Sequence, residues 1–143
     1  MSQIRIANKQ DEPHIRALAK DALASISKEL DLDGGDADLK NLEWNYFGRD
    51  GIFLVLEIEG KVAGYAGAAK MSEDAIEIKR LFAKPESGGG IENLLDMLLD
   101  FARKMDYRLV ECAQSAAELM PSTLLAKRFE EKDGRLISSV LSE

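Results

Sequence analysis

At 143 residues with 45% hydrophobic content, the chain can build one packed core, so one domain spanning residues 1–143 is predicted. Its 26 acidic residues outnumber 19 basic ones, which argues against nucleic acid as a partner and mildly favours cationic or amine-bearing molecules. Without a leader-like apolar segment or a run of roughly 20 apolar residues, we expect a cytoplasmic protein that makes no membrane contact, and a single cysteine and a single histidine cannot assemble a Cys/His zinc site.

The first half of the chain predicts a short strand, helices and a hairpin. Residues 4–6 alternate as a strand does, and a helical period follows through Ile15, Leu18, Ala22 and Ile26. Residues 31–38 read as a solvated loop, because their four aspartates lack the glutamate that would complete a calcium loop. A short helix is predicted over residues 38–47. Two apolar strands, 52–58 and 62–69, flank the turn Glu59-Gly60 and form a predicted hairpin.

The second half alternates strands and helices. A strand over 75–83 and a glycine-rich break lead into a helix through 91–102, whose leucines recur at helical spacing. A short strand at 109–112, a helix over 120–129 and a last strand over 136–141 complete the pattern. The order predicts an α/β domain of three layers, in which helices flank a mixed, mostly antiparallel central sheet.

One segment resembles a known family. Residues 77–86, EIKRLFAKPE, followed by a glycine loop and an amphipathic helix, are similar to the acetyl-CoA-binding strand, turn and helix of the GNAT family of N-acetyltransferases. Residues 126–134, AKRFEEKDG, resemble that family's second signature, and the hairpin ending in residues 62–65 also suits it. The resemblance covers nearly the whole chain and implies that acetyl-CoA is the cosubstrate.

The glycine loop has a physical reason in such a family. Free N–H groups at a helix start bind anions such as a pyrophosphate, and glycines allow close approach of the backbone. Here the loop departs from the family pattern, since it lacks the usual Arg or Gln and is about two residues short when the helix leucines are aligned. Glu92 adds a carboxylate in the first helical turn, where it would repel bound phosphate.

The resemblance also implies site residues. Glu77 is the candidate base, while burial against a sheet is expected to raise its pKa; the alternative is a solvated glutamate paired with Lys79 or Arg80. Glu130 takes the place of the family's tyrosine acid, with Tyr65 or Tyr107 as alternatives. Cofactor contacts are implied for Leu81, Phe82, Ala83, Gly88, Gly89, Gly90, Ile91, Thr123 and Phe129, and acceptor contacts for Trp44 and Tyr65.

The predicted function is therefore transfer of an acetyl group from acetyl-CoA to a small-molecule or peptide amine by direct attack. The altered loop and the absent tyrosine keep a second reading open, namely a catalytically weakened GNAT-like domain that senses CoA or binds a partner. The acceptor and the oligomeric state, a homodimer included, are left open. Cys112 is expected to be a buried, inert thiol.

Overall fold

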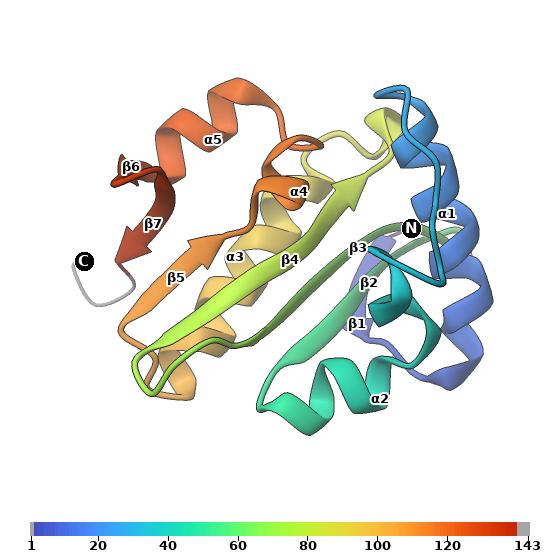
Figure 1. The fold of residues 1–143 in the computed structure, drawn as a ribbon. Coiled ribbons are helices and arrows are strands. Elements are labelled where there is room, and N and C mark those ends of the chain that lie inside the picture. The colour runs from blue at the N-terminus through green and yellow to red at the C-terminus, as the bar shows by residue number, and fades with distance from the viewer. Residues whose placement is uncertain (1, 140–143) are drawn as a thin grey trace.

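A computed structural model describes residues 2–139, and one seven-stranded sheet runs through them (Figure 1). The strands lie in the order β1-β2-β3-β4-β5-β7-β6, and only the β4–β5 pair is parallel. Their bounds are β1 Ser2–Ile6, β2 Ile52–Ile58, β3 Lys61–Lys70, β4 Ala75–Ala83, β5 Leu109–Cys112, β6 Glu130–Lys132 and β7 Arg135–Ser139. The helices are α1 Glu12–Ala24, α2 Leu42–Asn45, α3 Gly90–Lys104, α4 Gln114–Ala117 and α5 Ser122–Arg128.

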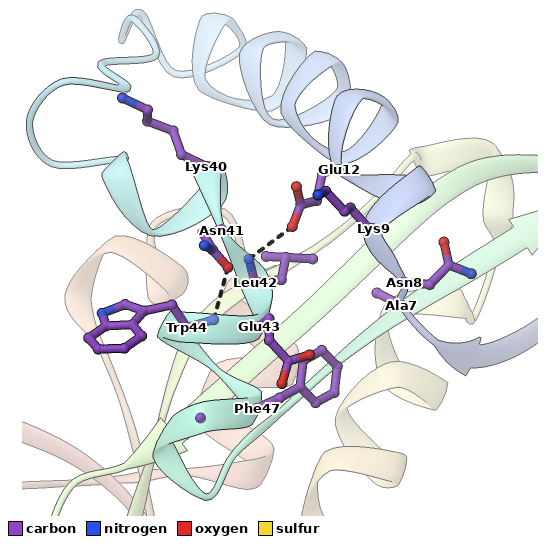
Figure 2. A pocket seen from close by; sticks show the side chains of 11 residues that line it. Ala7, Asn8, Lys9, Glu12, Lys40, Asn41, Leu42, Glu43, Trp44 and Phe47 are labelled. Atoms are coloured by element: carbon purple, nitrogen blue, oxygen red, sulfur yellow. Dashed lines mark hydrogen bonds between the residues drawn. The ribbon is translucent and has the colours of Figure 1, made fainter.

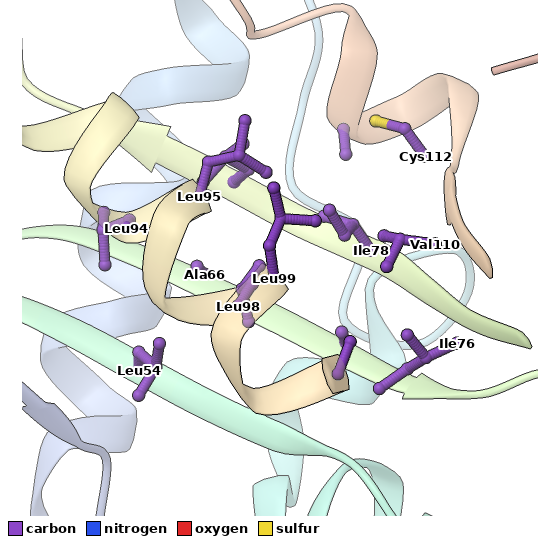
Figure 3. Close-up of a cluster of buried hydrophobic side chains, with 14 of the residues drawn as sticks. Leu54, Ala66, Ile76, Ile78, Leu94, Leu95, Leu98, Leu99, Val110 and Cys112 are labelled. Atoms are coloured by element: carbon purple, nitrogen blue, oxygen red, sulfur yellow. The ribbon is translucent and has the colours of Figure 1, made fainter. Parts of the chain in front are cut away.

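Helices cover both faces of the sheet, which confirms the three-layer fold (Figure 1). Along β2 the buried residues alternate between two cores: Leu54 and Leu56 face α3, whereas Phe53 and Val55 face α1 and α2. This division follows from the two-residue period of a strand. Figure 3 shows the α3 side, where Leu94, Leu95, Leu98 and Leu99 pack onto strand residues such as Ile78 and Val110.

The strongly patterned elements lie where the sequence predicts them. The hairpin turn at Glu59 and Gly60 has positive φ at both residues, as a two-residue turn that matches strand twist requires. The strands 75–83 and 109–112 have the predicted bounds. Hydrophobic periodicity is therefore sufficient to predict the strands in the central part of the sheet.

Other predictions were incomplete. The helix expected over 38–47 is broken into separate turns, Ala37–Lys40, Leu42–Asn45 and Phe47–Arg49, because the side chain of Asn41 caps a new helix start by accepting from the N–H of Trp44. The helix over 120–129 is shorter, α4 and β6 were missed, and part of the last predicted strand lies outside the described residues.

Candidate active site

The two parallel strands, β4 and β5, separate in the middle of the sheet. Their pairing ends at Ile78 and Cys112, after which the N–H of Ala113 donates to the carbonyl of Ile78 and the chain turns into α4. Strand β4 continues alone for five more residues on that side, as Figure 1 shows. At the same point the pairing of β4 with β3 has a bulge: Gly67 pairs with Arg80 and Ala68 with Ile78, so that Lys79 is the extra residue. A bulge of this kind bends its strand.

A cavity of about 210 Å³ lies where the strands separate, and we call it the gap pocket. Its walls come from β3, β4, α4 and the chain around the end of α1, so that segments distant in sequence meet here. Residues that line it include Tyr65, Lys79, Arg80, Leu81, Asp36 and Ser115.

The glycine loop lies at the end of β4. Gly88 has φ +66°, and a Cβ built on Gly88 or Gly89 would meet no atom within 4 Å, so this backbone is open. Gly90 differs, since it is the first residue of α3 and its Cβ would lie 2.5 Å from Leu56 and 2.8 Å from the Ser87 hydroxyl. The first intrahelical donor is Asn93, which bonds the Gly89 carbonyl, and the preceding N–H groups of the first turn have no acceptor within the helix.

Glu92, in the first turn of α3, is paired with two basic side chains. Its Oε2 lies 3.6 Å from both Lys127 Nζ and Arg128 Nη1 of α5. Arg128 also donates to Asp96 at 2.7 Å. Two cations from a separate helix thus offset the carboxylate that the sequence places beside the loop, and local sequence gave no sign of this pairing.

Glu77 lies on the sheet face opposite α3, one residue before the strands separate. It is half-buried, and this desolvation raises its pKa; the positive charge of Lys79 opposes the shift and the nearby Glu111 adds to it. The raised pKa agrees with the expectation for a buried base. Arg80, in contrast, is not its partner.

Arg80 instead binds the loop that was predicted to be solvated. Its Nη2 lies 2.6 Å from Asp38 Oδ1 and 2.9 Å from Asp36 Oδ1, and the three side chains are only 11–17% exposed. The hydroxyl of Tyr46 donates to Asp38 as well. The expectation of a solvated loop was wrong for these two aspartates, because Arg80 on β4 offers a bidentate partner that only tertiary folding brings near.

The two residues implied for the acceptor lie in different places. Tyr65 is buried between Phe53 and Phe82 and lines the gap pocket. Trp44 is 69% exposed and lines a separate cavity of about 740 Å³ between α2 and the start of α1. In Figure 2 its indole is directed away from α1, because Leu42 and Tyr46 take the inward positions of this short helix.

The residues of the second signature do not gather at the gap pocket either. Phe129 is buried in the core on the α3 side, and Thr123 is exposed on α5. Glu130 is exposed on β6, three strand spacings from Glu77, or roughly 14 Å. Tyr107 donates its hydroxyl to the carbonyl of Asp50, and neither residue lines the gap pocket.

Cys112 is buried, and its pKa is raised to about 12, chiefly by desolvation and further by Glu77. This agrees with an inert thiol. Within residues 2–139 no group of three or more His, Cys, Asp or Glu side chains could hold a metal ion, and no helix there is long and apolar enough to span a membrane.

The chain belongs to the GNAT family of acetyltransferases. The model described as "Acetyltransferase (GNAT) family" matches residues 17–129. No curated protein is similar enough in sequence to count as a match.

Several solved acetyltransferases of low sequence identity share this fold. A GNAT-family acetyltransferase from Staphylococcus aureus Mu50 superposes with a TM-score of 0.86 at 14% identity, over 98% of this chain and 99% of that one. The putative acetyltransferase yncA from Salmonella typhimurium, solved with its cofactor acetyl-CoA, gives 0.69 at 19% identity, over 100% and 96%. N-acetylglutamate synthase from Neisseria gonorrhoeae, complexed with coenzyme A and N-acetyl-glutamate, gives 0.71 at 21%, over 98% of this chain but 35% of that one. At these identities the likeness establishes the fold.

Proposed function

We propose that the chain is an N-acetyltransferase that uses acetyl-CoA as its cosubstrate and acetylates an amine held beside Glu77. The observation that carries the proposal is the separation of β4 from β5, with an open glycine backbone at the adjoining helix start. When bound, acetyl-CoA would supply a thioester carbon for attack by the amine. The chain's own residues would bind the cosubstrate, orient the acceptor and move the protons.

The backbone of β4 suits the binding of an extended amide chain. The N–H of Lys84 donates to Ala63 of β3, and peptide groups alternate along a strand, so Leu81 and Ala83 direct theirs away from β3 and toward the gap. These two N–H groups are the proposed donors for the developing oxyanion and for the cosubstrate's amides, whereas the neighbouring Phe82, by the same alternation, directs its N–H toward β3 and is not one of them. Phosphate groups would lie at Gly88, Gly89, Gly90 and Ile91, where the helix dipole favours negative charge.

Two protons must be moved during the reaction. Glu77 is the proposed base, because its raised pKa increases its affinity for the amine's proton. Tyr65 is the better candidate for the acid than Glu130, since it lines the gap pocket whereas Glu130 is exposed on β6. Burial raises the pKa of Tyr65, so its phenol keeps its proton at neutral pH.

The test is a calorimetric titration of acetyl-CoA, followed by release of free CoA in the presence of a panel of amines. Micromolar binding with turnover on at least one amine is the expected result. Binding without turnover would favour the alternative of a CoA-sensing domain, for which the exposed position of Glu130 and Thr123 is the supporting observation. Failure to bind millimolar acetyl-CoA would contradict both functions.

Replacing Glu92 by Gln is expected to tighten CoA binding by about twofold to fivefold, the range for one charge near a helix start. The effect should be small because Lys127 and Arg128 already offset this carboxylate, and removing it leaves both cations for phosphate. Calorimetry on Glu92→Gln would measure the change in CoA affinity, with Glu43→Gln on α2 as the control. Unchanged or weaker binding in Glu92→Gln would contradict the expectation.

A further inference from the structure

A row of acidic residues crosses the sheet on the face opposite α3. The register places Glu111 of β5 directly beside Glu77 of β4, and Ile137 of β7 beside Glu111. Neighbouring strands are about 4.8 Å apart, and residues in register point to the same face. Glu77 and Glu111 are therefore adjacent carboxylates, whereas Glu130, opposite Ile137, lies beyond them.

Glu111 is the unusual member of this row. It is only 6% exposed, its Oε1 accepts from Arg135, and its Oε2 is buried with no hydrogen-bond partner among the described residues. Buried carboxylate oxygens nearly always have a donor, because desolvation without one is unfavourable. A buried acceptor of this kind points to a donor that residues 2–139 do not provide.

The two carboxylates make this position favourable for a cation. Like charges on adjacent strands destabilise one another, and the raised pKa of Glu77, caused first by burial and in part by Glu111, reflects that. The cations that face the pair are Lys79 on β4 and Arg135 on β7, and Arg135 contacts only the other oxygen of Glu111. Arg80 is already bound to Asp36 and Asp38.

The pair adjoins the gap pocket. Glu77 comes one residue before Ile78, where pairing with β5 ends, and the pocket lining begins at Lys79. A group bound between the carboxylates would thus lie within one or two residue spacings of the gap, each about 3.3 Å. Beside it on the same face are Leu109, which is 37% exposed, and the half-buried Ile137.

We propose that Glu111 and Glu77 together bind the ammonium group of the acceptor, and that the acceptor is accordingly a cationic primary alkylamine. An ammonium group offers three N–H donors, which suits one oxygen of Glu111 and the carboxylate of Glu77, and the alkyl chain would lie against Leu109 and Ile137. Glu111 is an acceptor-binding residue in this scheme, and the proposal rests on the acetyltransferase function proposed above.

The protons and electrons balance in this scheme. The bound ammonium gives one proton to Glu77, and the freed lone pair forms the new C–N bond to the acetyl carbon. The C–S bond breaks, and the sulfur keeps its electron pair and takes up a proton from Tyr65, which is then reprotonated through solvent as Glu77 gives up its own proton. The nitrogen loses its second proton to solvent, so the products are an N-alkylacetamide, free thiol and one released proton.

The test is a titration of n-pentylammonium into the protein, with and without saturating CoA, at a pH where the amine is protonated. Its neutral counterpart, n-pentanol, is titrated in parallel. We expect wild type to prefer the ammonium by at least about tenfold, and Glu111→Gln to lose that preference, as removal of a charged hydrogen bond predicts. The substitution keeps the side-chain shape and an oxygen for Arg135, and thermal unfolding checks the fold.

Two further variants make the result decisive. Glu77→Gln removes the less buried carboxylate and should also reduce the preference for ammonium. Glu131 is an exposed glutamate of β6 that pairs with Leu136 of β7, and Glu131→Gln should leave the preference unchanged. Equal binding of ammonium and alcohol by wild type, or an unchanged preference in both Glu111→Gln and Glu77→Gln, would overturn the proposal. A lack of CoA binding would instead contradict the proposed function, while the titration without CoA would still test the ammonium site.

Discussion

Replacing Arg80 by Met is expected to lower the free energy of unfolding by about 3–5 kcal/mol at pH 7, the usual effect of removing one partner of a buried ion pair. Arg80 is 11% exposed and donates from Nε and Nη2 to Asp38 at 3.0 and 2.6 Å. Without it, Asp36 and Asp38 are left close together with little access to water. Urea unfolding followed by circular dichroism would measure the loss.

The pH dependence of this loss follows from Asp38. Burial alone raises the pKa of Asp38, but the hydrogen bond and charge of Arg80 outweigh it, and the net pKa is lowered. A lowered folded-state pKa stabilises the fold above the unfolded value near 3.8, and that stability disappears as the pH falls through the folded value. The difference between wild type and Arg80→Met should therefore persist as the pH falls from 7 to about 4 and narrow only below about 3.8.

The matched control is Arg108→Met, because Arg108 is exposed and its loss should cost less than about 0.5 kcal/mol. A loss below about 1 kcal/mol in Arg80→Met would mean that the cluster does not hold residues 31–38 against β4. Since Gly35 and Asp36 line the gap pocket, we also expect the KM for the acceptor to rise in Arg80→Met.

Replacing Glu77 by Gln is expected to lower kcat by about 10²–10³-fold while leaving acetyl-CoA affinity within about twofold, as loss of a general base predicts. Glutamine keeps the size of the side chain but cannot take the amine's proton. The rise of kcat/KM with pH that reports the ionisation of Glu77 should disappear from the profile of the variant. A rate within threefold of wild type at every pH would remove Glu77 as the base, with Glu131→Gln as the control.

Stability provides an independent readout on the same variant. Burial raises the pKa of Glu77 in the folded state, so its contribution to stability is present below the unfolded value and is lost as the pH rises through the folded value. Glu77→Gln should accordingly melt at a higher temperature than wild type at pH 7.5, and this gain should vanish below about pH 4. A variant that is more stable but inactive would separate catalysis from a structural role.

The amino-acid sequence by itself determined the central elements of this fold. In the strands 52–58 and 75–83 the apolar residues recur with a period of two, and in helix α3 they recur with a period of 3.6. Each period reflects which face of the element is buried, and it is a local property of the sequence. The turn between β6 and β7 has a local signal as well, because the pair Asp133-Gly134 is favoured where both turn residues take positive φ, as they do here. The strands that it joins are too short to show a period.

The tertiary structure decided which side chains share the candidate site. It places Glu111 beside Glu77, Asp36 and Asp38 on Arg80, and Lys127 near Glu92, while it separates Trp44 from Tyr65. The pairs that it brings together are 34 to 44 residues apart in the sequence, and what joins them on the sheet is strand order, register and the bulge at Lys79. A local pattern determines which face of an element is buried, but the packing of the whole sheet determines what that face meets.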